Sequence, residues 1–328
     1  MKFLHFSDPH FSAIGPISRT DDYMETCFRK LDEIIGIAKK EGTDVILCSG
    51  DFFHLKSWMR NPYLLTNKLI DAFRAMPGEV LGIYGDHDTP DRNESSLDRQ
   101  PLSTLCRSTQ LKLLSKAVFW SGPVGGNVLV TGAPKVDNYE ADLTNYVPDL
   151  HSEPSYPSGI VSVHIHLSHG DLYIKPPVYE PYTLYSRLCG SHVDYHFNGH
   201  VHDDLGEVKV GKTTIINRGS LTRGSLVESN LKRKVTVTLL DTGKNTIRYI
   251  ELKSALPASK IFDLDRVKET RQAEEEIARL GELIKFESGN VELSGPESIR
   301  HLVRELKTVK EPVKTKIFEL LDRAETYQ

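Results

Sequence analysis

Hydrophobic and polar residues alternate over residues 2–8 (KFLHFSD), which predicts a strand that ends in a carboxylate. Apolar side chains then recur at helical spacing over 21–42, where a glycine marks the expected end of the helix. The continuous apolar run within 43–51 (TDVILCSGD) is typical of a strand buried on both faces. A second amphipathic helix over about 62–76 leads to another apolar run at 79–88 (EVLGIYGDHD). The pattern therefore predicts strand, helix, strand, helix, strand.

This alternation favours an α/β sheet, and each of its three strands ends in a cluster of Asp or His residues. Ligands bind beyond the carboxyl ends of the strands in such sheets, so the clusters can converge. The later part of the chain is richer in strands, which makes two layers of sheet plausible: 127–134, 159–170, 194–202, 213–221, 233–241 and 246–252. Long surface loops are expected at 137–159 and 173–183; they either face a substrate or are insertions without a function.

After about residue 255 the composition changes to charged segments with helical spacing and without a histidine cluster. We therefore expect a domain of residues 1–254 and a C-terminal helical region of residues 255–328. The apolar stripes of these helices either pack on their own domain or dock on a partner helix: Ile299, Leu302, Val303 and Leu306, then Ile317, Phe318, Leu320 and Leu321.

Composition is that of a globular chain, with 328 residues, 39% hydrophobic and 26% charged. No apolar run approaches the about 20 residues that cross a bilayer, and the first ten residues lack a signal-peptide pattern. The four cysteines have no CxxC spacing and are expected to be reduced thiols, so we expect a cytoplasmic protein without a membrane partner. A net charge of -4 argues against a broad electrostatic grip on nucleic acid, so any DNA contact must be local or helped by a partner.

Histidines are concentrated in the first two thirds of the chain, where twelve of the thirteen lie at or before position 202. The chemistry is therefore expected there. Five short stretches carry these histidines, three of them together with carboxylates: DPH (Asp8, His10), GDFFH (Asp51, His54), GDHD (Asp86, His87, Asp88), HG (His169) and GHVH (His200, His202).

Asp8 and His10 are two residues apart on a segment expected to be extended, so their side chains should point to one face, and the same holds for His200 and His202. Mixed imidazole and carboxylate ligands suit Mn, Fe, Zn or Co better than Ca. Three carboxylates and four histidines are too many for one ion but suit two ions with a bridging carboxylate. Two ions about 3.5 to 4 Å apart activate a bridging hydroxide and bind a phosphoryl oxygen, which predicts phosphoester hydrolysis.

The five stretches, in this order, resemble the D-x-H, GD-x-x, GNH(D/E), H and GH-x-H pattern of the calcineurin-like metallophosphoesterase superfamily. The resemblance implies an α/β fold, a four-layer α-β-β-α sandwich followed here by a small, mainly helical region. It also implies two divalent metal ions with Asp51 as the bridge. One ion would be held by Asp8, His10, Asp51 and His202, and the other by Asp51, Asp86, His169 and His200.

Within the superfamily, MKFLHFSDPHFS, VILCSGDFFHLKS and IYGDHDTP look most like the SbcD and meiotic recombination nuclease family, and INRGSLTR is similar to its N-P-G-S-x-x-R segment with Arg218 in place of proline. The resemblance covers about residues 1–252. It implies a manganese-dependent 3′-5′ exonuclease and endonuclease that acts on DNA ends and binds a coiled-coil ABC-type ATPase. A homodimer through the N-terminal helices and C-terminal helices on the base of the coiled coil are implied as well.

Three further residues receive roles from this resemblance. His87 would protonate the leaving oxygen or stabilise its charge, Asp88 would orient the His87 imidazole, and His54 would steer DNA ends. For His164 and His166, which alternate along a strand, we expect a structural role only.

Asp86 departs from the family, which has Asn at this position. An aspartate still coordinates through oxygen, but its added charge lowers the Lewis acidity of the ion and repels a phosphodiester. Reduced nuclease activity with metal binding retained is the resulting hypothesis. Three functions stay open: a DNA nuclease, a small-molecule phosphodiesterase or phosphatase with a pocket built by the long loops, and a catalytically dead scaffold that binds DNA ends.

Overall fold

The computed structural model describes residues 1–16, 19–114, 118–120, 127–149, 161–224 and 228–265. Beyond these it describes isolated positions between 300 and 318. The chain divides into two compact units, Met1–Phe262 and Asp263–Gln328. Residues 255–262 thus belong to the first unit, in which Ala258, Ile261 and Phe262 are buried. Most of the expected C-terminal helices lie outside the described residues, so their role as a partner-binding region stays a prediction.

Six strands form the first sheet, in the order β14 (Thr246–Glu251), β13 (Thr236–Asp241), β1 (Lys2–Phe6), β2 (Val45–Cys48), β3 (Glu79–Gly82) and β4 (Leu111–Leu113). Strands β1 to β4 are parallel, whereas β13 and β14 run antiparallel at one edge. Because β1, β2 and β3 are parallel neighbours, the segments that follow them emerge at one edge of the sheet. This confirms the strand, helix, strand pattern expected from the sequence.

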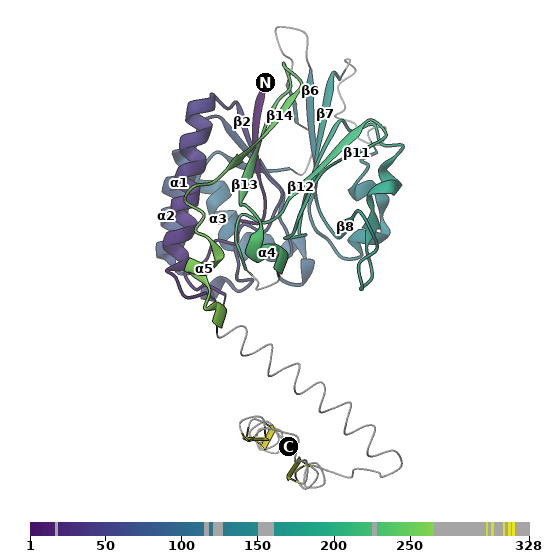
Figure 1. Ribbon diagram of the computed structural model, residues 1–328. Coiled ribbons are helices and arrows are strands. Elements are labelled where there is room, and N and C mark those ends of the chain that lie inside the picture. Colours follow the sequence, from purple (N-terminus) through teal and green to yellow (C-terminus); the bar gives the residue numbers. More distant parts are fainter. Residues whose placement is uncertain are drawn as a thin grey trace, which may run out of the picture. The chain divides into compact units, whose positions relative to one another are not determined.

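Helices α1 (Tyr23–Glu41), α2 (Tyr63–Arg74) and α3 (Pro101–Ser108) cover the outer face of this sheet (Figure 1). The side chain of Asp22 accepts a hydrogen bond from the Glu25 amide and caps the start of α1. Gly42 ends α1 with φ 63°, a left-handed conformation that glycine adopts without strain. The apolar stripe of α1 and the outward side chains of β1, such as Leu4, share one buried cluster.

A second six-stranded sheet faces the first, in the order β11 (Asp204–Val210), β12 (Thr213–Arg218), β10 (Tyr195–Gly199), β7 (Val163–His169), β6 (Val128–Ala133) and β5 (Val118–Trp120). Side chains that alternate along the strands fill the space between the sheets. Phe3 and Leu47 come from the first sheet, and Ile165 and Phe197 from the second. The two layers of sheet expected from the sequence are therefore present.

The outer face of the second sheet carries a fourth layer that differs from the expected α-helices. Within the described residues it consists of short 3-10 turns and loops around buried tyrosines such as Tyr139 and Tyr185. Short turns suffice because each bulky ring covers much of the sheet surface by itself. The turns and the small strand pair β8 and β9 have the following bounds: η4 (Tyr139–Ala141), η5 (Leu143–Asn145), η6 (Tyr185–Leu188), β8 (Leu172–Tyr173) and β9 (Thr183–Leu184).

The remaining elements are short and lie in connections: η1 (Trp58–Arg60), η2 (Pro90–Arg92), η3 (Glu94–Arg99), α4 (Glu228–Lys232) and α5 (Ala258–Ile261). None of the helices in the described part of the chain is both long enough and apolar enough to span a membrane. The loop expected at 137–159 contains two of the 3-10 turns, and its residues 150–159 lie outside the described ones.

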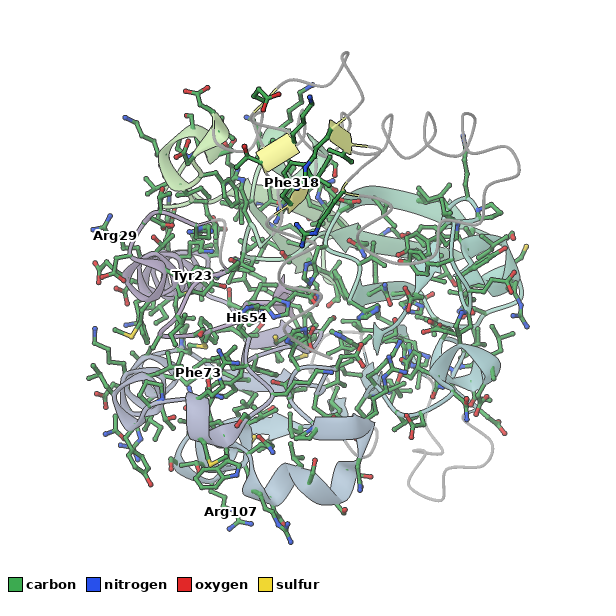
Figure 2. All side chains as sticks on the ribbon, turned by 90° about the horizontal axis from the view of Figure 1, so that it is seen from below. Tyr23, Arg29, His54, Phe73, Arg107 and Phe318 are labelled. Carbon is green, nitrogen blue, oxygen red and sulfur yellow. The ribbon has the colours of Figure 1, made fainter. Side chains whose placement is uncertain are left out.

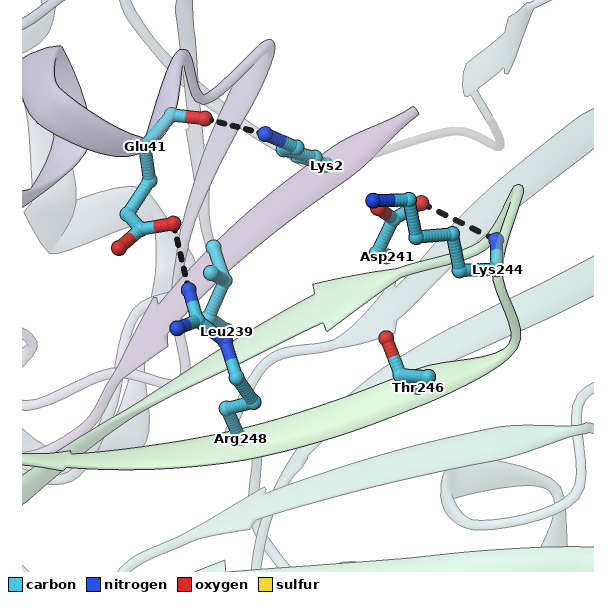
Figure 3. Close-up of a pocket in the computed structure, with 7 residues that line it drawn as sticks. All are labelled: Lys2, Glu41, Leu239, Asp241, Lys244, Thr246 and Arg248. Atoms are coloured by element: carbon cyan, nitrogen blue, oxygen red, sulfur yellow. Dashed lines mark hydrogen bonds and ion pairs between the residues drawn. The ribbon is translucent and has the colours of Figure 1, made fainter.

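A polar crevice of about 360 Å³ lies at the end of the first sheet where β1 begins (Figure 3). Lys2 donates a hydrogen bond to the carbonyl oxygen of Glu41, and Arg248 pairs with the Glu41 carboxylate. Lys2 and Arg248 are thus both bound to Glu41. The candidate metal ligands follow the other end of β1, so the crevice is separate from them.

Four histidines are buried in the strands and contact polar neighbours. Thr131 Oγ1 lies 2.8 Å from both His164 Nε2 and His166 Nδ1, and His5 Nε2 lies 2.8 Å from Ser49 Oγ. His196 Nε2 bonds Ser168 Oγ at 2.7 Å. The structural role expected of His164 and His166 agrees with this packing.

We expect these histidines to make stability depend on pH. Burial lowers the pKa of His5 to about 3 and that of His166 to about 4, and it also lowers the pKa of His164 and His196. Since the unfolded chain takes up protons near pH 6.5, the free energy of unfolding should fall as pH drops from 6.5 toward 4.5. Each histidine contributes at most about 1.4 kcal/mol per pH unit. Urea denaturation at several pH values measures the slope, which His166→Gln should reduce; a slope unchanged by this variant would contradict the prediction.

Candidate metal centre

All seven predicted ligands lie at the carboxyl ends of strands. Asp8 and His10 follow β1, Asp51 follows β2, Asp86 follows β3, His169 ends β7, and His200 and His202 follow β10. Six of them form two groups whose ligand atoms lie within 4.8 Å of one another: Asp8, His10, Asp51 and His202, and Asp51, His169 and His200. Asp51 belongs to both groups, so its carboxylate is placed to bridge two ions.

The distances within the groups suit cations between the side chains. Asp51 Oδ2 lies 3.6 Å from His10 Nε2 and 3.4 Å from His169 Nε2. His10 Nε2 and His202 Nε2 are 2.9 Å apart, and His202 Nε2 is 3.8 Å from Asp8 Oδ1. Two imidazole lone pairs that face each other repel, unless a proton or a metal ion lies between them.

His169 provides the clearest test of whether a metal fits. Its Nδ1 lies 2.6 Å from the carbonyl oxygen of Ser49, and in the neutral ring whose Nδ1–H donates to this oxygen, Nε2 has the lone pair that a metal ion needs. This Nε2 is fully buried, makes no well-formed hydrogen bond among the described residues, and faces the Asp51 carboxylate at 3.4 Å. A metal ion would use it. Fixing the second nitrogen by a carbonyl is the usual support for a metal-binding histidine.

The electrostatics of the centre also favour positive charge. Burial lowers the pKa of His169, but attraction to the Asp51 carboxylate outweighs burial and raises the pKa to about 10. Burial raises the pKa of Asp51, yet the neighbouring His169 and His10 hold it well below its usual range. The donor set of carboxylates and imidazoles therefore fits divalent cations of the first transition row.

Four of the predicted ligands have a left-handed backbone rather than an extended one. The φ angles are 49° for Asp8, 45° for His10, 52° for Asp51 and 73° for His200. The expectation that Asp8 and His10 share a face through strand alternation was therefore wrong, because both lie in a tight turn after β1. Such conformations cost about 1 kcal/mol or more for residues other than glycine and cluster at functional sites.

His200 and His202 also differ from the expectation that they approach one ion from the same face. With φ 73° at His200, the two imidazoles separate. His202 lies with Asp8 and His10, whereas His200 lies with His169. This division is the one implied by the resemblance.

Three glycines allow the ligand loops to close around His169. Added Cβ atoms would lie 2.5 Å from His169 Nδ1 at Gly50, 2.6 Å from His169 Nε2 at Gly85, and 2.8 Å from His169 Nδ1 at Gly199. Each glycine directly precedes a predicted ligand. The sequence stretches GD, GD and GH are therefore explained by the close approach of three loops to one buried ring.

Asp86 lies beside the second group. Its Oδ2 is 3.3 Å from His200 Nδ1, and its Oδ1 accepts a hydrogen bond of 2.8 Å from Arg92 Nε. The side chain of Asp86 is 10% exposed and that of Arg92 is 43% exposed. Sequence reasoning did not identify Arg92, which lies in the 3-10 turn six residues after Asp86.

Asp171 is a second residue that sequence reasoning missed. Its Oδ2 lies 3.1 Å from His200 Nε2, so the other nitrogen, Nδ1, faces Asp86. Lys135 is buried and pairs with Glu140 at 2.7 Å and with Asp171 at 3.6 Å, and Glu140 accepts from the Asp171 amide. A carboxylate two residues after His169 was the available signal. Asp171 orients a predicted ligand in the way that supporting carboxylates do at metal sites.

Replacing Asp171 by Asn should weaken Mn²⁺ binding by about 10-fold to 100-fold, the usual effect of losing a supporting carboxylate. The variant keeps the shape but removes the charge that fixes the His200 tautomer at 3.1 Å. Titration with Mn²⁺ followed by electron paramagnetic resonance measures the change. Glu251→Gln is the matched control, since Glu251 pairs with exposed Lys234. Equal affinities of the two variants would exclude the role.

His87 and His54 lie at the edge of the first group, and both are half-buried. Their rings are stacked, with centroids 5.7 Å apart, and together with His10 they form a third set of close imidazoles. Figure 2 shows His54 on the inner side of Tyr23, toward the middle of the molecule. The His87 amide donates to Asp51 Oδ1 at 2.8 Å, which ties His87 to the shared carboxylate.

Asp88 does not have the role that was expected for it. His87 Nδ1 lies 2.6 Å from the carbonyl oxygen of His54, so this carbonyl orients the imidazole. The Asp88 carboxylate is buried and accepts hydrogen bonds from the amides of Phe52, Phe53 and Gly85. Asp88 therefore holds the loops after β2 and β3 together.

The two facing sheets place carboxylates and imidazoles together at the strand ends, an arrangement that suits a metal-dependent phosphoester hydrolase. The family model of the calcineurin-like phosphoesterases matches residues 1–204, more than half of the chain. The protein belongs to this family.

Over 107 residues the chain is 31% identical to the DNA double-strand break repair protein Mre11 of Saccharolobus solfataricus. This match covers 32% of the chain and 27% of that relative, so the chain spans less than a third of its length. Similar solved structures include GAP50 of Plasmodium (15% identity, TM-score 0.48, 78% of this chain and 86% of that one). A dimetal phosphatase from Danio rerio is similar as well (13% identity, TM-score 0.45, 74% of this chain and 93% of that one).

Proposed function

We propose that the protein is a two-metal DNA nuclease, a manganese-dependent 3′-5′ exonuclease and endonuclease that processes double-strand ends. The observation that carries hydrolysis is the pair of ligand groups that share Asp51. DNA as the substrate is supported by the 107-residue match to a protein named for double-strand break repair, together with the GDFFH and HFSDPHF stretches.

The exposure of the ligands gives the direction from which a phosphodiester reaches the centre. The side chains of Asp8, Asp51 and His169 are at most 2% exposed, whereas those of His200 and His202 are 25% and 37% exposed. The centre is therefore closed toward the sheets and open on the β10 side. A polymer can lie across such an opening without entering a closed pocket.

Each of the two ions would be held by four residues of this chain, and a separate histidine would act on the leaving group. Asp8, His10, Asp51 and His202 hold one ion, and Asp51, Asp86, His169 and His200 hold the other. When bound, two such ions supply an activated water and neutralise charge on the phosphoryl group. His87, whose Nδ1–H donates to the His54 carbonyl, directs Nε2 away from that bond, and the imidazolium form of the ring would give its Nε2 proton to the leaving oxygen and keep the proton on Nδ1.

A partner is part of the proposal because the chain has a net charge of -4. Phosphate contacts on DNA usually come from clustered Lys and Arg, so a nuclease with this charge gains affinity from the surface of another subunit. We propose a coiled-coil ABC-type ATPase bound through the C-terminal helices, and a homodimer of this chain. Pull-down of the full chain with and without residues 263–328 tests the first of these contacts.

The nuclease is tested on end-labelled linear duplex DNA with Mn²⁺ and, in parallel, on bis(p-nitrophenyl) phosphate, each with and without the ATPase. Loss of label from 3′ ends, abolished in Asp51→Asn, is the expected result. Hydrolysis of the small ester alone would identify a small-molecule phosphodiesterase instead. Binding of DNA ends without cleavage of either substrate would identify a scaffold.

A further inference from the structure

The two oxygens of the Asp86 carboxylate have different neighbours. Oδ1 accepts from Arg92 Nε at 2.8 Å, while Oδ2 faces His200 Nδ1 at 3.3 Å. One oxygen is therefore engaged by a cation of the chain itself. The other is directed to the second ligand group, to which His200 belongs.

Arg92 reaches Asp86 through an unusual backbone conformation. Its φ is 53°, in the left-handed region that arginine rarely adopts. It ends the 3-10 turn Pro90–Arg92, and its amide donates to the Thr89 carbonyl at 3.3 Å. Strain of this kind persists where a contact maintains it. Among the described residues, the side-chain contact of Arg92 is the bond to Asp86.

We infer that Arg92 is a positioning residue that makes Asp86 act as a neutral, one-oxygen ligand, as a carboxamide would. The guanidinium occupies Oδ1 and balances the carboxylate charge, so Oδ2 alone is offered to an ion. Three carboxylates, Asp8, Asp51 and Asp86, would otherwise reduce the positive charge of the centre toward an anionic phosphodiester. The repulsion expected from Asp86 in the sequence is offset by this pair.

The inference rests on the metal sites proposed above but not on DNA as the substrate. The inference predicts the direction in which metal affinity changes, because the Arg92 guanidinium repels a divalent cation and competes with it for Asp86 Oδ1. Removing Arg92 should therefore strengthen metal binding, whereas loss of a merely structural residue would weaken it or leave it unchanged. In a chain with Asn at position 86, Arg92 has no carboxylate to balance, and its removal should matter little.

The experiment is a double-mutant cycle on Mn²⁺ binding with four proteins: the natural chain, Arg92→Gln, Asp86→Asn and the combination. Calorimetry measures the weaker of the two Mn²⁺ dissociation constants, and circular dichroism checks the fold. Arg92→Gln should bind Mn²⁺ about tenfold more tightly than the natural chain does. The double variant should bind Mn²⁺ less than about twofold more tightly than Asp86→Asn alone. Arg92→Lys, which keeps the charge, should stay within threefold of the natural chain.

Arg107→Gln is the matched control, since Arg107 forms an exposed pair with Asp98 at 2.8 Å. The inference would be overturned if Arg92→Gln changed the Mn²⁺ affinity equally in the natural chain and in Asp86→Asn. It would also be overturned if Arg92→Lys changed the Mn²⁺ affinity as much as Arg92→Gln does. If the Arg92 and Asp86 substitutions are coupled in Mn²⁺ affinity but the protein does not cleave DNA, the inference holds and the nuclease proposal is rejected. If the protein cleaves DNA but the two substitutions are not coupled, the nuclease proposal holds and the inference is rejected.

Discussion

Asp51→Asn should abolish both phosphodiester hydrolysis and the binding of a pair of Mn²⁺ ions. The Oδ2 atom of Asp51 lies 3.4 Å and 3.6 Å from imidazole nitrogens of the two groups, and Oδ1 accepts from the His87 amide. One substitution therefore affects both ions and the position of His87. Loss of a supporting residue alone costs about 10-fold to 100-fold, so we expect a loss on the order of a thousandfold or more in kcat/KM.

The measurement combines Mn²⁺ stoichiometry with hydrolysis of bis(p-nitrophenyl) phosphate. Asp98→Asn is the control, because Asp98 is exposed and pairs with Arg107, which is exposed as well. Asn is nearly the size of Asp, so the shape of the loop is kept. Binding of two Mn²⁺ ions by Asp51→Asn would show that another residue bridges the ions.

The gathering of the ligands could be predicted from the sequence because it depends on a general property of parallel strands. β1, β2 and β3 have clear apolar patterns, and residues after neighbouring parallel strands emerge at one edge. Asp8, Asp51 and Asp86 therefore lie at the same edge of the sheet, whatever the details of the loops. Their chemistry then follows from residue type alone.

The local geometry could not be predicted, because tertiary packing decides it. The left-handed φ angles of Asp8 and His10 occur where this turn bonds to the loop after β2, about 40 residues away in the chain: the Asp8 amide donates to the Gly50 carbonyl and the His10 amide to the Asp51 carbonyl. A pattern of alternating residues predicts an extended segment and carries no information on these bonds. The same reason explains why His200 and His202 separate.

The roles of supporting residues were also hidden from the sequence. Asp88 follows His87 directly, which favoured a side-chain pair, but backbone amides of Phe52 and Phe53 compete for its carboxylate. The main-chain carbonyl oxygen of His54 orients His87 instead. Every residue has such a carbonyl, so it leaves no signature in the sequence. Asp171 and Arg92 act through contacts that only the fold creates.

His87→Gln should reduce cleavage of DNA by about 10²-fold to 10⁴-fold, the usual contribution of a general acid, with Mn²⁺ affinity unchanged. His87 is outside the two groups that contain Asp51, which are the groups proposed to hold the ions. The p-nitrophenolate ion leaves readily without a proton, whereas the alkoxide of a sugar does not. The same variant should therefore lose much less activity on bis(p-nitrophenyl) phosphate than on DNA.

His54→Gln is the matched variant, because the bond of 2.6 Å to His87 Nδ1 comes from the main-chain carbonyl and is kept. It should leave hydrolysis of the small ester close to that of the natural chain and affect DNA ends if the imidazole contacts them. Equal losses of His87→Gln on both substrates would exclude proton donation and indicate that His87 acts by binding the phosphoryl group. The ratio of the two rates thus separates the acid role of His87 from a role in binding.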